Sequence, residues 1–142
     1  MTAQSDRIGA IIAAHHHREG PLLPILHDIQ KEFGCVDAES EALVARGLNL
    51  SRAEVHGVVS FYHDFHERYD ARPVVQICRA EACQARGVEG LIEAAGQAAG
   101  QRVRIESVFC LGLCSAGPAA RTGDTLYARL NAARLAKVIE TA

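Results

Sequence analysis

Apolar residues in the first part of the chain recur at helical spacing. Ile8, Ile11 and Ile12 fall on one face, and five apolar residues in the segment Leu22–Phe33 repeat at intervals of three and four. Each pattern is typical of a helix with one buried and one solvated side. Two amphipathic helices are therefore predicted before residue 35.

Two further helices are predicted before residue 65. A short one is expected from about Glu39 to Arg46, ending at Gly47. Ser51 and Glu54 have the spacing of a capping box, in which each side chain bonds to the backbone of the other residue. A fourth helix should begin there. The residues up to position 72 thus predict a small helical bundle.

The periodicity changes at about residue 73, where a domain boundary is predicted between residues 1–72 and residues 73–142. Val74, Val75, Gln76 and Ile77 form a mostly apolar run of strand length. This run predicts a short buried strand that leads directly into a cysteine at position 78.

The rest of the second domain predicts one more strand, a hairpin and two helices. A helix is expected from about Cys83 to Ala99, followed by a strand over residues 102–108. Gly123 marks a hairpin turn, and Asn131 can cap a last helix. The order strand, helix, strand, hairpin, helix is typical of a thioredoxin-like domain, so the fold class is α+β or α/β, with a helical bundle before that domain.

Composition and charge exclude several classes of partner. The chain has 142 residues, 49% of them apolar, with 15 Lys and Arg against 17 Asp and Glu. No block of like charge is present to attract nucleic acid or an anionic membrane. The apolar run Ile8–Ala14 is too short to span a bilayer and lacks the flanks of a secretion signal. A cytoplasmic protein is expected.

Four of the five cysteines form two closely spaced pairs. Cys78 and Cys83 have four residues between them, Cys110 and Cys114 have three, and each pair follows a predicted strand. Reduced cytosolic thiols in such pairs favour metal ligation over disulfides. A [2Fe–2S] cluster needs four thiolates, two on each iron, which predicts that these four cysteines bind one such cluster.

The loops around the cysteines carry two further expectations. Gly112 and Gly117 should let the second loop turn tightly and bring backbone N–H groups toward the sulfurs. A helix beginning near Cys83 should aim its positive N-terminal end at the cluster.

Two other kinds of site stay open for the same cysteines. One is a dithiol oxidoreductase that reacts through Cys78 and Cys83, and the other is a zinc-stabilised interaction module. Both are disfavoured by spacing, because redox dithiols and zinc ribbons mostly use pairs with two intervening residues.

The fifth cysteine and the histidines are expected to lie outside the site. Cys35 is predicted to be a packed or half-exposed thiol. The run His15–His17 occupies consecutive helical positions, which point about 100° apart and predict a solvated surface. His56, His63 and His66 are expected to make hydrogen bonds or to face a partner.

Aromatic and charged residues also occur close to the predicted boundary and in the first loop. Phe61, Tyr62 and Phe65 are expected to pack in the core between the two domains. Arg79 and Glu81 lie within the first cysteine loop, where they are either exposed charges or residues that tune the cluster and its partner contacts.

Nearly the whole chain resembles the thioredoxin-like [2Fe–2S] ferredoxin family, which includes the 24-kDa subunit of respiratory complex I. The resemblance lies in the segments Leu22–Gln30 and Val55–Phe65 and in the two cysteine pairs. It implies an electron-transfer subunit that is not catalytic alone.

Within that family, Leu50–Gly57 and Cys78–Gln84 look most like the gamma subunit of soluble, molybdenum-dependent, NAD-linked formate dehydrogenases. This resemblance implies two partners, a diaphorase subunit with FMN and a [4Fe–4S] cluster and a molybdenum-containing catalytic subunit. The alternatives are the equivalent subunit of complex I or of an NAD-reducing hydrogenase.

Overall fold

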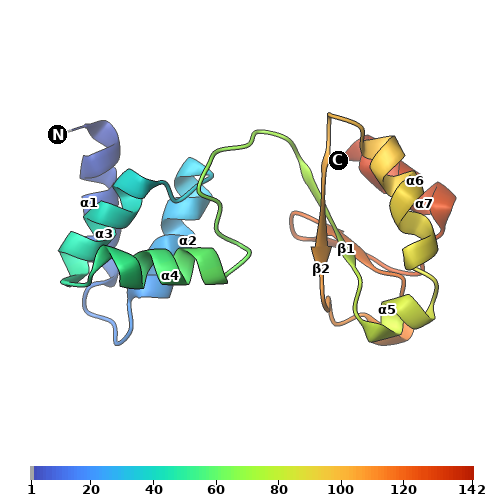
Figure 1. Cartoon of the computed structure of the whole chain (residues 1–142), viewed down its shortest axis with the longest axis horizontal. Coiled ribbons are helices and arrows are strands. Elements are labelled where there is room, and N and C mark those ends of the chain that lie inside the picture. Colours follow the sequence, from blue (N-terminus) through green and yellow to red (C-terminus); the bar gives the residue numbers. More distant parts are fainter. Residues whose placement is uncertain (1) are drawn as a thin grey trace. The chain divides into compact units, whose positions relative to one another are not determined.

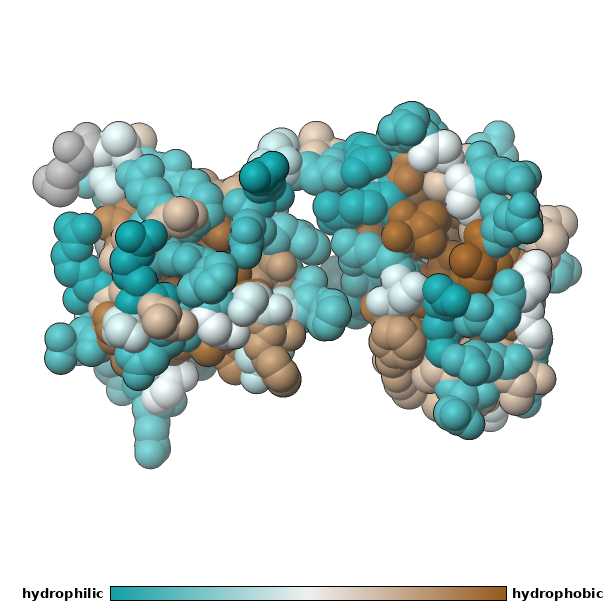
Figure 2. Space-filling view, in the orientation of Figure 1, coloured by the Kyte–Doolittle hydropathy of each residue, from teal (hydrophilic) through white to brown (hydrophobic). Residues whose placement is uncertain are grey.

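The computed structural model describes residues 2–142 and divides into two compact units, one ending at Ala71 and the other comprising Arg72–Ala142 (Figure 1). Each unit has its own hydrophobic core. No helix within residues 2–142 has the length and apolar character needed to cross a membrane. On the face drawn in Figure 2, hydrophilic and apolar side chains are mixed over both units.

Four helices build the described part of the first unit, residues 2–71, as predicted. They are α1 (Ala3–His15), α2 (Leu22–Phe33), α3 (Ala38–Leu48) and α4 (Arg52–Phe61). Their apolar faces meet in one core, which also takes in two residues from the connecting segments: Ile8, Ile11, Ile12, Ile25, Leu26, Ile29, Val36, Val44, Ala45, Val55, Val59 and Phe65.

The predicted start of α4 is confirmed in atomic detail. The Ser51 hydroxyl accepts a hydrogen bond from the Glu54 backbone N–H, and the Glu54 carboxylate accepts one from the Ser51 backbone N–H at 2.8 Å. Two N–H groups that the helix cannot satisfy internally are bonded in this way.

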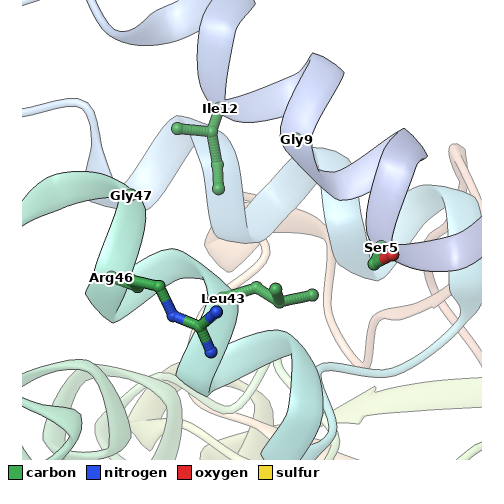
Figure 3. A pocket seen from close by; sticks show the side chains of 6 residues that line it. All are labelled: Ser5, Gly9, Ile12, Leu43, Arg46 and Gly47. Atoms are coloured by element: carbon green, nitrogen blue, oxygen red, sulfur yellow. The ribbon is translucent and has the colours of Figure 1, made fainter. Parts of the chain in front are cut away.

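The predicted end of α3 at Gly47 is wrong, because the helix continues to Leu48 and is capped by Asn49 in a left-handed conformation. Gly47 instead permits close helix packing, since a Cβ there would lie 3.0 Å from the Ile12 Cδ1 atom. Figure 3 shows these two residues on neighbouring helices, where they line a pocket of about 310 Å³ together with Ser5, Gly9, Leu43 and Arg46.

Of the three aromatic residues expected to pack between the two domains, Phe65 lies in the core of the helical unit itself. Its side chain is buried there, and its ring centroid lies 4.9 Å from that of His27. Phe61 is 73% exposed and Tyr62 is 40% exposed. The expectation that Phe61 packs in a core is therefore wrong.

The second unit is a four-stranded mixed sheet with the order β2-β1-β3-β4. Its strands are β1 (Val74–Cys78), β2 (Arg104–Val108), β3 (Ala120–Thr122) and β4 (Thr125–Tyr127). The central strand β1 pairs in parallel with β2, with Val75 opposite Ile105, and antiparallel with β3. The predicted β-α-β unit and the hairpin at Gly123 are confirmed.

The connection between β1 and β2 differs from the single helix predicted over residues 83–99. It consists of a short helix, α5 (Glu81–Ala85), and a longer one, α6 (Glu89–Ala99). The helical conformation is interrupted at Gly87, whose φ of +88° lies in the left-handed region that glycine adopts readily. Helix α6 therefore begins six residues after Cys83.

The last helix, α7 (Ala132–Thr141), begins at the predicted cap, since the Asn131 side chain accepts a hydrogen bond from the Arg134 backbone N–H. Helices α6 and α7 lie side by side (Figure 1). The core of this unit consists of Val75, Ile77, Cys78, Cys83, Val88, Ala95, Ala99, Val103, Ala119, Ala120, Leu130, Leu135, Val138 and Ile139.

We predict that Gly34→Ala destabilises the helical unit by about 1–3 kcal/mol. Gly34 ends α2 with a φ of +75°, and an added Cβ would lie 2.5 Å from the Tyr69 ring. Gly20→Ala is the matched control, because Gly20 has a φ of +64° and open space around it. Urea denaturation of the full chain should show the larger loss for Gly34→Ala. Equal losses would show that the Tyr69 contact adds nothing.

We predict that the stability of the helical unit depends on pH through His56. Its ring Nδ1 lies 3.0 Å from the buried Glu41 carboxylate, whose hydrogen bond and negative charge raise the pKa of His56, with a smaller effect from Glu67. A raised folded-state pKa means that this stabilisation is complete below the ordinary pKa of about 6.5 and is lost as the pH rises through the folded-state value.

The measurement is urea denaturation between about pH 6 and pH 8.5, comparing the wild-type chain with His56→Gln. The wild-type free energy of unfolding should fall more over this range than that of the variant. Parallel pH profiles for the two proteins would contradict the role of His56.

Candidate metal centre

The two cysteine loops leave the sheet at the same edge. Cys78 is the last residue of β1, and Cys110 comes two residues after the end of β2. Because β1 and β2 are parallel neighbours, with Cys78 opposite Val108, their carboxyl ends lie together. The topology therefore brings the two pairs to one place.

The first pair is held inside the unit. Cys78 and Cys83 are each only 2% exposed, and both belong to the hydrophobic core. The Cys78 backbone N–H donates to the carbonyl of Ala119 at 2.9 Å, which fixes the end of β1 against the segment before β3. Cys83 is the third residue of α5 and hydrogen bonds to the Cys78 thiol.

The second pair lies at the surface. Cys110 and Cys114 are both exposed, and their sulfurs are 3.6 Å apart. Two thiolates on one tetrahedral metal with bonds of about 2.3 Å are about 3.8 Å apart. The spacing of this pair therefore suits shared ligation of one iron.

Two glycines shape the second loop. Gly112 has a φ of +77°, and its backbone N–H donates to the Cys110 sulfur at 3.3 Å. Gly117 packs against the other pair, since a Cβ added there would lie 3.0 Å from the Cys83 sulfur. The expected N–H contact with a sulfur is confirmed at Gly112. Gly117 instead allows the second loop to pack closely against Cys83.

The thiols affect one another electrostatically. Two hydrogen bonds lower the pKa of Cys110. The larger effect comes from the Gly112 backbone N–H, and the smaller one from Cys114. The reciprocal hydrogen bond with Cys110 raises the pKa of Cys114, and the Cys78 thiol adds to that effect. Burial is the main cause that raises the pKa of Cys83. The neighbouring thiols Cys78 and Cys114 raise it further. The sulfur–sulfur distance that accompanies these effects is the 3.6 Å between Cys110 and Cys114.

The donor set fits a binuclear cluster. The cysteines lie as two pairs, one buried and one exposed, and a [2Fe–2S] cluster takes two thiolates on each iron. Four soft sulfur donors match the ligand preference of iron–sulfur chemistry.

A helix does begin close to Cys83, as expected, but it is the short helix α5, which starts at Glu81 and has only five residues. Cys83 lies in the middle of the five-residue helix α5, and the longer helix α6 begins only at Glu89. The positive end of a long helix therefore does not begin at Cys83.

The remaining candidate residues have other partners. Cys35 belongs to the helical unit and is half-buried, and burial, followed by the charge of Asp37, raises the pKa of its thiol. The His15 ring contacts Asp28 at 2.6 Å, so it is not part of a purely solvated surface. His16 and His17 are exposed, as predicted.

The partner of Arg79 could not be predicted from the sequence. Its guanidinium is paired with the carboxylate of Glu89, so Arg79 is not a free loop charge. The two residues are ten positions apart with a break in the helix between them. No local spacing rule links such positions.

Residues 8–142 match the model of the family described as thioredoxin-like [2Fe–2S] ferredoxin. The chain belongs to this family. The match covers both units and confirms the predicted thioredoxin-like fold and the [2Fe–2S] cluster as the cofactor of the family.

Relatives of this ferredoxin-family chain are subunits of larger oxidoreductases. It is 29% identical to an NADH-quinone oxidoreductase subunit of Rhizobium meliloti (strain 1021), over 96% of this chain and 86% of the relative. It is 26% identical to the NADP-reducing hydrogenase subunit HndA of Solidesulfovibrio fructosivorans, over 86% of this chain and 77% of the relative.

Its structure resembles that of an NAD⁺-reducing [NiFe]-hydrogenase in the H₂-reduced state, with a TM-score of 0.69 and 27% identity. The similarity covers 84% of this chain but only 22% of the hydrogenase chain. These relatives favour the complex I and hydrogenase alternatives over the predicted formate dehydrogenase.

Proposed function

We propose that the protein is a one-electron carrier in an NAD(P)H-linked oxidoreductase complex, with its [2Fe–2S] cluster bound by Cys78, Cys83, Cys110 and Cys114. The observation that carries the proposal is the arrangement of two thiol pairs at one edge of the parallel β1–β2 pair. Bound there, the cluster would supply reversible one-electron reduction.

The two cysteine pairs would hold the two irons in different surroundings. The buried pair, Cys78 and Cys83, would shield one iron from water, while Cys110 and Cys114 would hold the other at the surface. The Gly112 N–H donates to the Cys110 sulfur and would stabilise negative charge on it. No group that makes or breaks bonds in a substrate is needed for this role.

We propose residues 1–72 as a helical domain and residues 73–142 as the cluster-binding domain. Support comes from the separate cores of the two compact units. The relatives are subunits of NADH-quinone oxidoreductases and hydrogenases, which supports a flavin-bearing diaphorase subunit as the redox partner.

The parent complex can be identified by co-purification. Complex I and an NAD-reducing hydrogenase are the parents that the relatives favour. A formate dehydrogenase with a molybdenum subunit is the parent that the segment Cys78–Gln84 suggests. Oxidation of formate by the purified complex, together with bound molybdenum, would identify the latter. Oxidation of hydrogen or reduction of quinone would identify one of the others.

We predict about two irons and two acid-labile sulfides per anaerobically purified chain, with visible absorbance and a rhombic electron paramagnetic resonance signal after reduction. Replacing any of the four ligand cysteines by serine should lower iron and sulfide content severalfold, because each iron would lose a soft ligand. Cys35→Ser is the matched control and should keep the full content.

A colourless chain that stays free of iron after anaerobic reconstitution would contradict the proposal. Bound zinc without visible absorbance would indicate the interaction module instead. Titratable thiols at Cys78 and Cys83 without any metal would indicate the dithiol oxidoreductase.

A further inference from the structure

Arg79 connects the two cysteine loops through its backbone. It follows Cys78 directly, and its N–H donates to the carbonyl of Val108 at 2.8 Å. Val108 is the last residue of β2, two positions before Cys110. The Arg79 carbonyl accepts a hydrogen bond from the Gln84 side chain at 2.7 Å. The backbone of Arg79 therefore connects the start of the first loop to the end of β2, where the second loop begins, and to α5, which carries Cys83.

The side chain of Arg79 adds a link to α6. Its Nε donates to one carboxylate oxygen of Glu89 at 2.9 Å, and its Nη2 donates to the other at 2.6 Å. Nη1 also lies 3.4 Å from the hydroxyl of Ser107 on β2. A bidentate guanidinium–carboxylate pair fixes direction as well as distance.

This arrangement is more constrained than that of an ordinary surface charge. The Arg79 side chain is only 34% exposed. Its backbone N–H, its carbonyl and its guanidinium all have partners, and those partners lie on different elements. An isolated surface ion pair contributes little to stability, but here the pair closes a network that includes backbone hydrogen bonds.

We propose that Arg79, held by Glu89, is a positioning residue that fixes the spacing between the first and second cysteine loops and so slows loss of the cluster. The inference rests on the proposed function, because it concerns how firmly the bound cluster is retained. Since Arg79 carries a positive charge close to the thiols, its geometric effect must be separated from its charge.

Three variants make that separation. Arg79→Gln removes a positive charge and Glu89→Gln removes a negative one, so purely electrostatic effects on the cluster must have opposite signs. Both variants break the same bidentate pair, so effects on position must have the same sign. Arg79→Lys keeps the charge but loses the planar fork that binds both carboxylate oxygens.

The matched control is Arg7→Gln. Arg7 pairs with Glu32 at 2.6 Å in the helical unit, so this change removes an Arg–Glu pair that belongs to the other unit. Circular dichroism of all the variants checks that the full chain remains folded.

The experiment measures the rate at which visible absorbance is lost from the reconstituted full chain in excess iron chelator, together with the reduction potential and the g values of the reduced protein. We expect Arg79→Gln and Glu89→Gln each to accelerate loss about fivefold, a factor in keeping with one partly exposed charged pair. Both should shift the g values in the same direction.

Arg79→Lys should also accelerate loss, while Arg7→Gln should match the wild type. The double variant Arg79→Gln/Glu89→Gln should lose its cluster no faster than the single variants, because they remove one shared interaction.

Rates for Arg79→Gln and Glu89→Gln that match those of Arg7→Gln would overturn the inference and leave the proposed function intact. Opposite effects of these two variants on cluster loss would also overturn it, since charge alone would then account for them. A wild-type chain that takes up no cluster at all would overturn the proposed function and this inference with it.

Discussion

The parallel pairing of β1 with β2 is the constraint on which the site depends. Parallel neighbours end at the same edge of a sheet, so cysteines that follow each strand meet although they are far apart in sequence. The crossover through α5 and α6 supplies the length that a parallel connection requires, and it also carries Cys83. The same connection therefore completes the sheet and half of the candidate metal centre.

The two halves of the site lie in different environments. Cys78 and Cys83 are part of the hydrophobic core, so their positions depend on the packing that stabilises the whole unit. Cys110 and Cys114 lie on an exposed loop that is ordered by its own hydrogen bonds and by the contact of Gly117 with Cys83. A rigid half and a surface half suit a group that has to be held firmly and still exchange electrons with another protein.

Features set by neighbouring residues could be predicted from the sequence, whereas features set by packing could not. The capping box at Ser51, the cap at Asn131 and the turn at Gly123 each depend on a few adjacent positions. The two cysteine pairs are also local patterns, and their common location follows from the predicted β-α-β order. By contrast, Gly47 is a residue type that often ends a helix, yet it lies within α3. Its missing side chain makes room for Ile12. The meeting of Arg79 with Glu89 leaves no periodic signal either, since it depends on how α6 returns along the sheet.

The separation of the two cores also determines how the cluster is coupled to folding. The helical unit buries its own isoleucines and valines and caps its own helices, and none of the four candidate ligands lies within it. In the second unit, two of those cysteines are core residues. Metal binding adds to folding free energy only where the ligands belong to the folding unit. The stabilisation that a cluster bound to these cysteines would supply therefore concerns the sheet, α5 and the second loop, whereas the helical unit has a hydrophobic core of its own.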